Sequence, residues 1–405
     1  MINRNSITQH YDKHKKTVAI TTIVFLMVAI APLLFRQTFE TIDLGHHIAF
    51  KSVLAALPLL PLYFCYKLDM DFSRRSRQAL IIFIGGISLL LVDIHSVYID
   101  GTGFLDGTVT HCSQYFVDAS NIEWQMNMHK HVLELNKVVL PHSYRFLPNC
   151  ILDYLLVLTN DFQFSTYLFR AVFMILLLYA IYYYSSLYCS HETALLTMLI
   201  YGTVYQISIR FYAGQITDPV SHLCFILSFI FLELDLFLYF ALAVLIGSLA
   251  KESILAMAGY YLLKSLWERR NLLKATLLLL LAVTLIAGIR IYVSHDIRYE
   301  NISEVGLDHI WTNLSSINPW GRQLLFTVGI FLPFVLLSFR TGIRSVRNLA
   351  LFLLPTLLLS NIMFSWMFET RNLIPALIPM ALLTANYLVS IYSDHDKPSL
   401  TTTGS

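Results

Sequence analysis

The chain has few charged residues. Only 13% of its 405 residues are Asp, Glu, Lys or Arg, whereas about a quarter is usual for a soluble domain. Hydrophobic residues make up 56% of the chain, and the mean hydropathy is +0.62. A soluble core cannot hide that many apolar side chains and still leave enough polar ones to cover its surface. The composition therefore excludes a soluble globular protein.

An excess of one charge sign is also missing, and so are paired cysteines. The net charge is only +2, so the basic excess of nucleic-acid-binding proteins is absent and we expect no nucleic-acid partner. The five cysteines form no CxxC pair, which argues against a zinc ribbon and a thioredoxin-type site. No HExxH motif or paired-carboxylate spacing supports a divalent metal. We therefore expect no required cofactor.

Long apolar runs are what the sequence has instead. Runs of roughly 16 to 22 residues match the length that crosses about 30 Å of hydrocarbon. We expect an all-α, polytopic integral membrane protein with about twelve transmembrane helices (11–13). The expected spans are 17–35, 47–66, 78–97, 164–187, 193–211, 216–234, 236–250, 252–267, 274–294, 323–340, 348–366 and 373–392.

The distribution of Lys and Arg predicts the orientation of these spans. With the N-terminus inside, inner loops carry about 16 Lys and Arg in about 70 residues and outer loops about 8 in about 122, as the positive-inside rule requires. Both termini are then cytoplasmic, in what we expect to be a bacterial inner (plasma) membrane. The predicted units are 1–97 (tail and three spans), an outer loop at 98–163, a transmembrane core at 164–392 with a second outer loop at 295–322, and a tail at 393–405.

The first outer loop contains two segments with helical character. Residues 122–136 place Ile122, Met126, His129 and Leu133 on one stripe, which predicts an amphipathic helix on the membrane surface. The apolar run 146–159 is only about 14 residues long, too short for a span. We expect it to be a second interfacial or re-entrant helix.

Ionisable residues gather at the outer ends of the expected spans. Such groups cost about 2.5 to 3.5 kcal/mol each at the bilayer centre, so a cluster of them is a functional hypothesis. Simpler readings stand beside it: loop carboxylates are often only solvated, Asp218 before Pro219 is an ordinary helix N-cap, and Lys251 and Arg371 can reach the headgroups. The outer set is Asp43, Asp100, Asp106, Asp118, Arg145, Arg170, Asp218, Lys251, Arg290 and Arg371.

The order of these elements resembles the polytopic GT-C glycosyltransferases, such as the protein O-mannosyltransferases and the lipid A aminoarabinose transferases. Those enzymes take their sugar from a polyprenyl phosphate. Each motif alone is common, and the resemblance lies in their order over roughly 90–380. The motifs are VDASNIEW (117–124), VVLPHSYRFLP (138–148), LFRAVF (168–173), ITDPV (216–220), AKES (250–253) and ETRNLIPALIP (369–379).

The resemblance implies a role for each matching residue. Asp118 would be the general base and Asp218 a second acid, while Lys251 and Arg371 would face the phosphate. Further substrate contacts would come from Tyr144, Arg145, Arg170 and Glu369. The family's acidic loop usually follows the first span directly, so Asp43 is an alternative base, as is Asp106. We favour Asp118 because the amphipathic helix and the Tyr144-Arg145 element follow it.

The predicted activity is transfer of a sugar from a polyprenyl-phosphate donor to an acceptor hydroxyl at the outer face. The acceptor would be a lipid, a glycan or a protein, and membrane lipids would surround the enzyme. One carboxylate base suffices for a single inverting displacement, unlike the two-carboxylate route of retaining glycosidases. A polymerase, flippase or transporter of lipid-linked glycans is the alternative, although the sequence shows no internal repeat of the kind that many transporters have.

Overall fold

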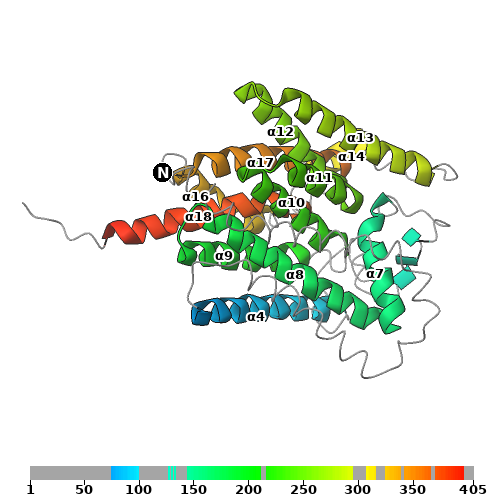
Figure 1. Cartoon of the computed structure of the whole chain (residues 1–405), viewed down its shortest axis with the longest axis horizontal. Coiled ribbons are helices and arrows are strands. Elements are labelled where there is room, and N and C mark those ends of the chain that lie inside the picture. Colours follow the sequence, from blue (N-terminus) through cyan, green and yellow to red (C-terminus); the bar gives the residue numbers. More distant parts are fainter. Residues whose placement is uncertain are drawn as a thin grey trace, which may run out of the picture.

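The structure is a computed structural model, which describes ten ranges of the chain. They are residues 74–99, 126–127, 129–130, 132–133, 144–210, 216–294, 307–315, 324–338, 342–365 and 370–395. Helices dominate these ranges, which contain no strand. The prediction of an all-α chain is confirmed for this part. The helices gather into one elongated bundle, with α8, α9 and α10 in its middle in the view of Figure 1.

The elements follow the chain with short connections. They are α4 (Arg74–Ile99), α7 (Phe146–Thr159), α8 (Phe162–Ser186), α9 (His191–Arg210), α10 (Thr217–Glu233), α11 (Phe237–Ala250), η2 (Glu252–Ile254), α12 (Leu255–Glu268), α13 (Leu272–Ser294), α14 (Leu307–Ser315), η4 (Leu325–Gly329), α16 (Leu332–Leu337), α17 (Arg344–Phe364), η5 (Thr370–Leu373) and α18 (Ile374–His395). Helices α8 and α10 pack against each other, and α18 packs on α9 and α17.

Four helical segments in the described ranges are long and apolar enough to cross a membrane. They are α8, α13, α17 and the segment Thr370–Ile391, and they indicate a membrane protein. The number of twelve spans remains a prediction, because 17–35 and 47–66 lie outside the described residues. Helices α11 and α12 have 14 residues each, so each rises about 21 Å, less than the thickness of the hydrocarbon core.

Burial differs sharply between these helices. The side chains of α8 are mostly buried inside the bundle, whereas most of those on α13 are exposed. The exposed side chains of α13 include Leu273, Leu280 and Leu281. An apolar helix face without a protein partner fits contact with lipid, so α13 lies at the edge of the bundle.

The predicted short outer helix at 146–159 coincides with α7. It ends because Asn160 adopts a left-handed backbone conformation with φ 51°, which Asn tolerates better than most residues. The Asp161 carboxylate then accepts a hydrogen bond of 3.0 Å from the backbone N–H of Phe164 and caps α8. Two local signals thus reverse the chain between α7 and α8.

The segment predicted as an amphipathic surface helix is helical where it is described. The side chains of His129 and Val132 are buried in the protein. His129 Nδ1 lies 3.1 Å from Asn149 Oδ1 on α7, and the His129 ring packs against Phe162. This stripe therefore faces α7 and α8, and the protein provides the apolar surface that we expected the membrane to provide.

Two segments differ from the sequence expectation. The predicted span 323–340 contains the π-helical segment η4 followed by the short helix α16. Pro333 begins α16 and has no backbone N–H to continue a helix from η4. The second outer loop, expected without a helix, contains α14 at Leu307–Ser315. The Asn313 side chain there donates to the carbonyl oxygens of Ile362 and Ser365, at 3.0 and 2.8 Å.

Helices α10 and α11 approach closely at Gly247. A Cβ atom added to Gly247 would lie 2.9 Å from the Cβ of Cys224 on α10 and 3.0 Å from Cγ1 of Ile254. Real carbon atoms are rarely that close, so this position requires glycine. The close packing brings the end of α11 against the beginning of α10, where the charged residues meet.

We therefore expect Gly247→Ala to destabilise the protein, although Ala favours a helix by about 1 kcal/mol over Gly. Overpacking costs about 1 to 3 kcal/mol, so the midpoint of thermal unfolding in detergent should fall. The matched control is Gly259→Ala in α12, whose added Cβ would lie 3.7 Å from Phe352, an ordinary contact. Equal unfolding midpoints for the two variants would contradict the close approach.

Candidate functional site

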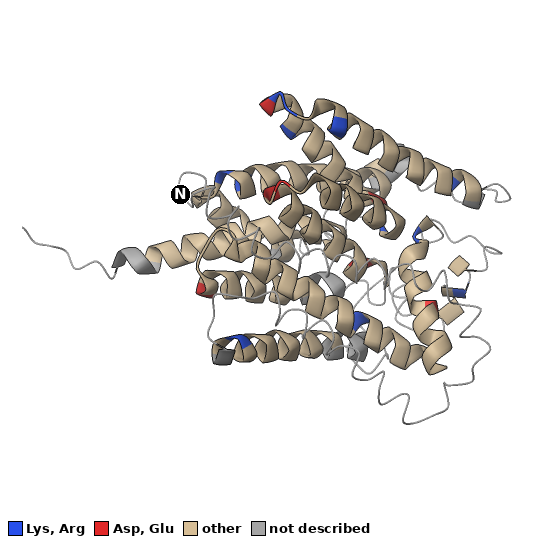
Figure 2. Cartoon of the chain, viewed as in Figure 1, with Lys and Arg blue, Asp and Glu red and all other residues tan. Residues whose placement is uncertain are grey.

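Charged side chains are scarce in the bundle and lie mostly near helix ends (Figure 2). At one end, Asp218 binds two cations. Its Oδ1 accepts a hydrogen bond of 2.8 Å from Lys251 Nζ, and its Oδ2 accepts one of 2.7 Å from Arg371 Nη1. All three side chains are at most 5% exposed. We call these residues the Asp218 triad.

The Asp218 triad joins three parts of the chain. Asp218 lies in the first turn of α10, where the helix dipole favours a negative charge. Lys251 follows α11, and Arg371 lies in η5, directly before α18. The N-cap interpretation of Asp218 is wrong, because the N-cap residue of α10 is Ile216 and no side-chain hydrogen bond caps the helix. The carboxylate binds cations instead.

A second carboxylate lies next to the first in the sequence. Glu252 Oε2 accepts a hydrogen bond of 3.0 Å from Arg145 Nε, and its Oε1 lies 3.3 Å from Arg290 Nη2 on α13. The Arg290 guanidinium also lies over the ring of Tyr144, 5.2 Å from its centroid. We call Glu252, Arg145 and Arg290 the Glu252 triad. It is more open than the Asp218 triad, since Arg290 is 47% exposed and Glu252 20% exposed.

The backbone at Lys251 explains how consecutive residues join two triads. Lys251 has φ −164° and ψ 132°, an extended conformation. In extended chain, successive side chains point to opposite sides. Lys251 therefore reaches Asp218, while Glu252 reaches Arg145 and Arg290. Together the two triads form the ionic cluster, in which four cations meet two carboxylates, so the described part of the cluster has an excess of positive charge.

The connection between α11 and α12 places its two ionisable residues in different environments. Burial lowers the pKa of the Lys251 ammonium to about 8, and the Asp218 carboxylate limits that shift by favouring the charged form. Burial raises the pKa of the Glu252 carboxyl, but the charge of Arg145, hydrogen bonds and the charge of Arg290 outweigh it and lower the pKa to about 2. Both side chains are therefore mainly charged at neutral pH.

Aromatic and basic side chains extend the cluster into the bundle. His222 follows Asp218 by one turn of α10, is buried, and packs edge-on against the Tyr205 ring at 5.9 Å. Tyr205 lies within electrostatic reach of Asp218, Arg170 and Arg371. Arg170, predicted as a substrate contact, is a buried residue of α8. A charged group in this interior thus has polar and aromatic neighbours on α8, α9 and α10.

The structure brings together most of the predicted substrate contacts that it describes. Asp218, Lys251 and Arg371 are in direct contact, and Arg145 and Tyr144 lie in or beside the Glu252 triad. The predicted base and three other candidates lie outside the described residues: Asp118, Asp43, Asp106 and Glu369. In the ranges that are described, no three His, Cys, Asp or Glu side chains form a group that could hold a metal ion.

Three residues of this region were missed as site residues. Glu252 stands beside Lys251 in the AKES motif, Arg290 was placed at the outer face without a role, and His222 was not considered. The spacing of Asp218 and His222 was an available signal, because residues four apart share a helix face. No sequence signal pairs Glu252 with Arg290, which is 38 residues away.

Asp218→Asn should destabilise the protein, because it leaves two buried cations without a counter-charge. Removing one partner of a buried ion pair costs about 3 to 5 kcal/mol. The midpoint of thermal unfolding measures this loss. The control is Asp235→Asn in the turn between α10 and α11, where φ is 58° and Asn fits well. An Asp218→Asn protein as stable as this control would show that the triad does not depend on the carboxylate charge.

Comparison with known proteins gives no family for this arrangement. No protein-family model, no curated protein and no solved structure matches the chain. The function proposed for the chain therefore rests on the ionic cluster and on the sequence motifs that contribute to it.

Proposed function

We propose that the chain is a multi-pass membrane enzyme that transfers a sugar from a polyprenyl-phosphate donor to an acceptor hydroxyl. The acceptor belongs to a lipid, a glycan or a protein. The reaction takes place at the outer membrane face, where the ionic cluster lies in the predicted orientation. Both chain termini are then cytoplasmic, and the membrane is a bacterial inner membrane.

The observation that supports this proposal most is the excess of cations at one end of an apolar bundle. A polyprenyl-phosphate donor has a long apolar chain and a phosphate that gains negative charge as the sugar leaves. An apolar scaffold suits the chain, and fixed cations stabilise the departing phosphate. Charge-assisted hydrogen bonds of this kind contribute about 1.5 to 3 kcal/mol each.

Asp218 has a positioning role in this proposal. Both of its carboxylate oxygens accept hydrogen bonds from cations, so the carboxylate is poorly placed to take a proton from an acceptor. It holds Lys251 and Arg371 at fixed positions, from which their charges act on the phosphate. We assign the base to Asp118 in the outer loop, as the motif order suggests.

The proposed step is a single displacement. The acceptor oxygen forms a bond to the anomeric carbon while the bond between that carbon and the phosphate oxygen breaks. The proton of the acceptor hydroxyl goes to Asp118, and polyprenyl phosphate leaves with the electron pair of the broken bond. Attack from the side opposite the leaving group inverts the anomeric centre.

Asp118→Asn should abolish sugar transfer in an inserted, folded protein, since a general base contributes about 10²- to 10⁴-fold to the rate. The assay incubates the purified protein in lipid nanodiscs with a panel of polyprenyl-phosphate monosaccharides and candidate acceptors. It measures the release of free polyprenyl phosphate. The controls are Asp106→Asn in the same loop and Asp43→Asn in the first short loop, which should keep the wild-type rate.

Two results would contradict this assignment. Full activity of Asp118→Asn together with loss in Asp43→Asn would move the base to the first loop. Movement of labelled donor across the membrane without release of polyprenyl phosphate would indicate a flippase. Joining of lipid-linked oligosaccharides into longer chains would indicate a polymerase.

A further inference from the structure

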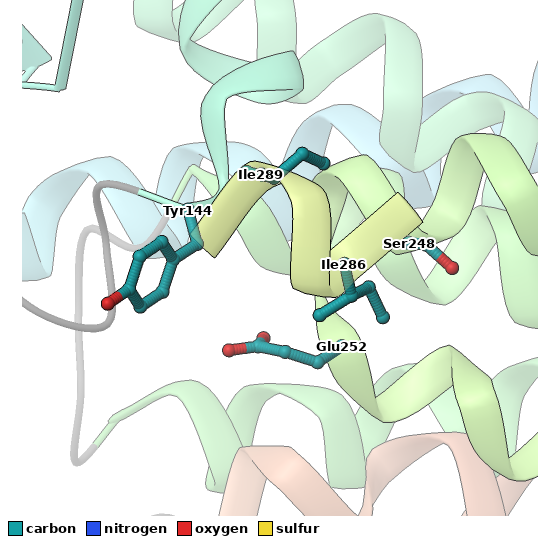
Figure 3. A pocket seen from close by; sticks show the side chains of 5 residues that line it. All are labelled: Tyr144, Ser248, Glu252, Ile286 and Ile289. Carbon is teal, nitrogen blue, oxygen red and sulfur yellow. The ribbon is translucent and has the colours of Figure 1, made fainter. Parts of the chain in front are cut away.

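A small crevice lies beside the Glu252 triad. It is lined by Tyr144, Ser248 of α11, Glu252, and Ile286 and Ile289 of α13, with about 200 Å³ of space including the part open to the exterior. In Figure 3 the two isoleucines project from the same helix, and the Glu252 carboxylate points toward Tyr144. The crevice is smaller than the roughly 300 to 1,000 Å³ of sites for drug-sized molecules. It therefore has room for a headgroup rather than a whole lipid.

The walls of the crevice differ in character. Tyr144 and the Glu252 carboxylate provide one polar side, and Ile286 and Ile289 provide an apolar one. The apolar wall belongs to α13, the span candidate with the smallest buried share. A ligand with a polar head and an apolar chain could place its head against Glu252 and extend its chain along the exposed surface of α13.

Two guanidinium groups meet at the polar side of the crevice. Arg145 and Arg290 both contact the Glu252 carboxylate, at 3.0 and 3.3 Å. They are more accessible than the cations of the Asp218 triad, since Arg145 is 12% exposed and Arg290 is 47% exposed, against 5% for Lys251 and 2% for Arg371. An anion arriving from the membrane therefore reaches Arg145 and Arg290 first.

The charges in the Glu252 triad do not balance. One carboxylate faces two guanidinium groups, whose planar donors suit the oxygens of a phosphate as well as those of a carboxylate. A phosphate monoester can carry two negative charges and has three free oxygens, so it matches two arginines better than one carboxylate does. The Glu252 carboxylate thus holds the two arginines in place and can be exchanged for a phosphate.

We propose that this crevice is the binding site for the phosphate of a single-chain lipid phosphate, which replaces the Glu252 carboxylate on Arg145 and Arg290. The apolar chain follows Ile286, Ile289 and the exposed face of α13. The identity of this lipid as the donor's carrier rests on the proposed function, whereas the binding itself requires no sugar. The assignment shifts direct phosphate contact from Lys251 and Arg371 to Arg145 and Arg290.

Binding of farnesyl phosphate, a short isoprenoid phosphate without a sugar, tests the proposal. Purified protein in nanodiscs of uncharged lipid is titrated with farnesyl phosphate, and bound ligand is counted by native mass spectrometry. Arg290→Gln should weaken binding about tenfold or more, and Glu252→Gln should strengthen it because the competing charge is gone. Arg270→Gln, an exposed cation in the connection between α12 and α13, should leave binding unchanged.

Several outcomes would overturn the proposal. They are equal binding by Arg290→Gln and wild type, weaker binding by Glu252→Gln, equal binding of farnesol, and displacement of farnesyl phosphate by an equal amount of phosphatidylglycerol. An unchanged unfolding midpoint of Arg290→Gln shows that its binding loss is local. Because the assay contains no sugar, binding without transfer would contradict only the proposed function, and transfer that Arg290→Gln leaves intact would contradict only this site.

Discussion

A carboxylate buried in an apolar bundle must be paired, and the arrangement at the ionic end depends on that constraint. An unpaired ionised group inside protein costs several kcal/mol. Asp218 meets the requirement with Lys251 from the end of α11 and Arg371 from the beginning of α18. The triad thereby fixes the positions of three chain segments, and the close approach of α10 and α11 at Gly247 makes the contact with Lys251 geometrically possible.

The extended backbone at Lys251 links this buried triad to an open one. Its neighbour Glu252 points to the other side and binds Arg145 and Arg290. One triad is sealed and acts as a structural anchor, whereas the other borders a crevice on the exposed helix α13. In the proposed enzyme, the anchor holds positive charge near the reaction and the open triad exchanges its carboxylate for the phosphate of the lipid.

Local features of the sequence predicted much of the fold. Apolar run lengths gave α7 its observed bounds and α8 nearly so, because helix ends are set by nearby residues such as Asn160 and Asp161. The same reasoning failed at 323–340, where Pro333 follows a π-helical segment. The cations of the site were identifiable because charge is scarce in an apolar chain. Their partners were not, since the pairing of Glu252 with Arg145 and Arg290 depends on packing between segments far apart in sequence.

The structure of the protein with bound farnesyl phosphate, determined by electron cryo-microscopy in nanodiscs, tests the central claim most directly. The account predicts phosphate density against Arg145 and Arg290, with the Glu252 carboxylate displaced and Asp218 still bonded to Lys251 and Arg371. Phosphate density between Lys251 and Arg371, with Asp218 displaced and the Glu252 triad intact, would contradict it.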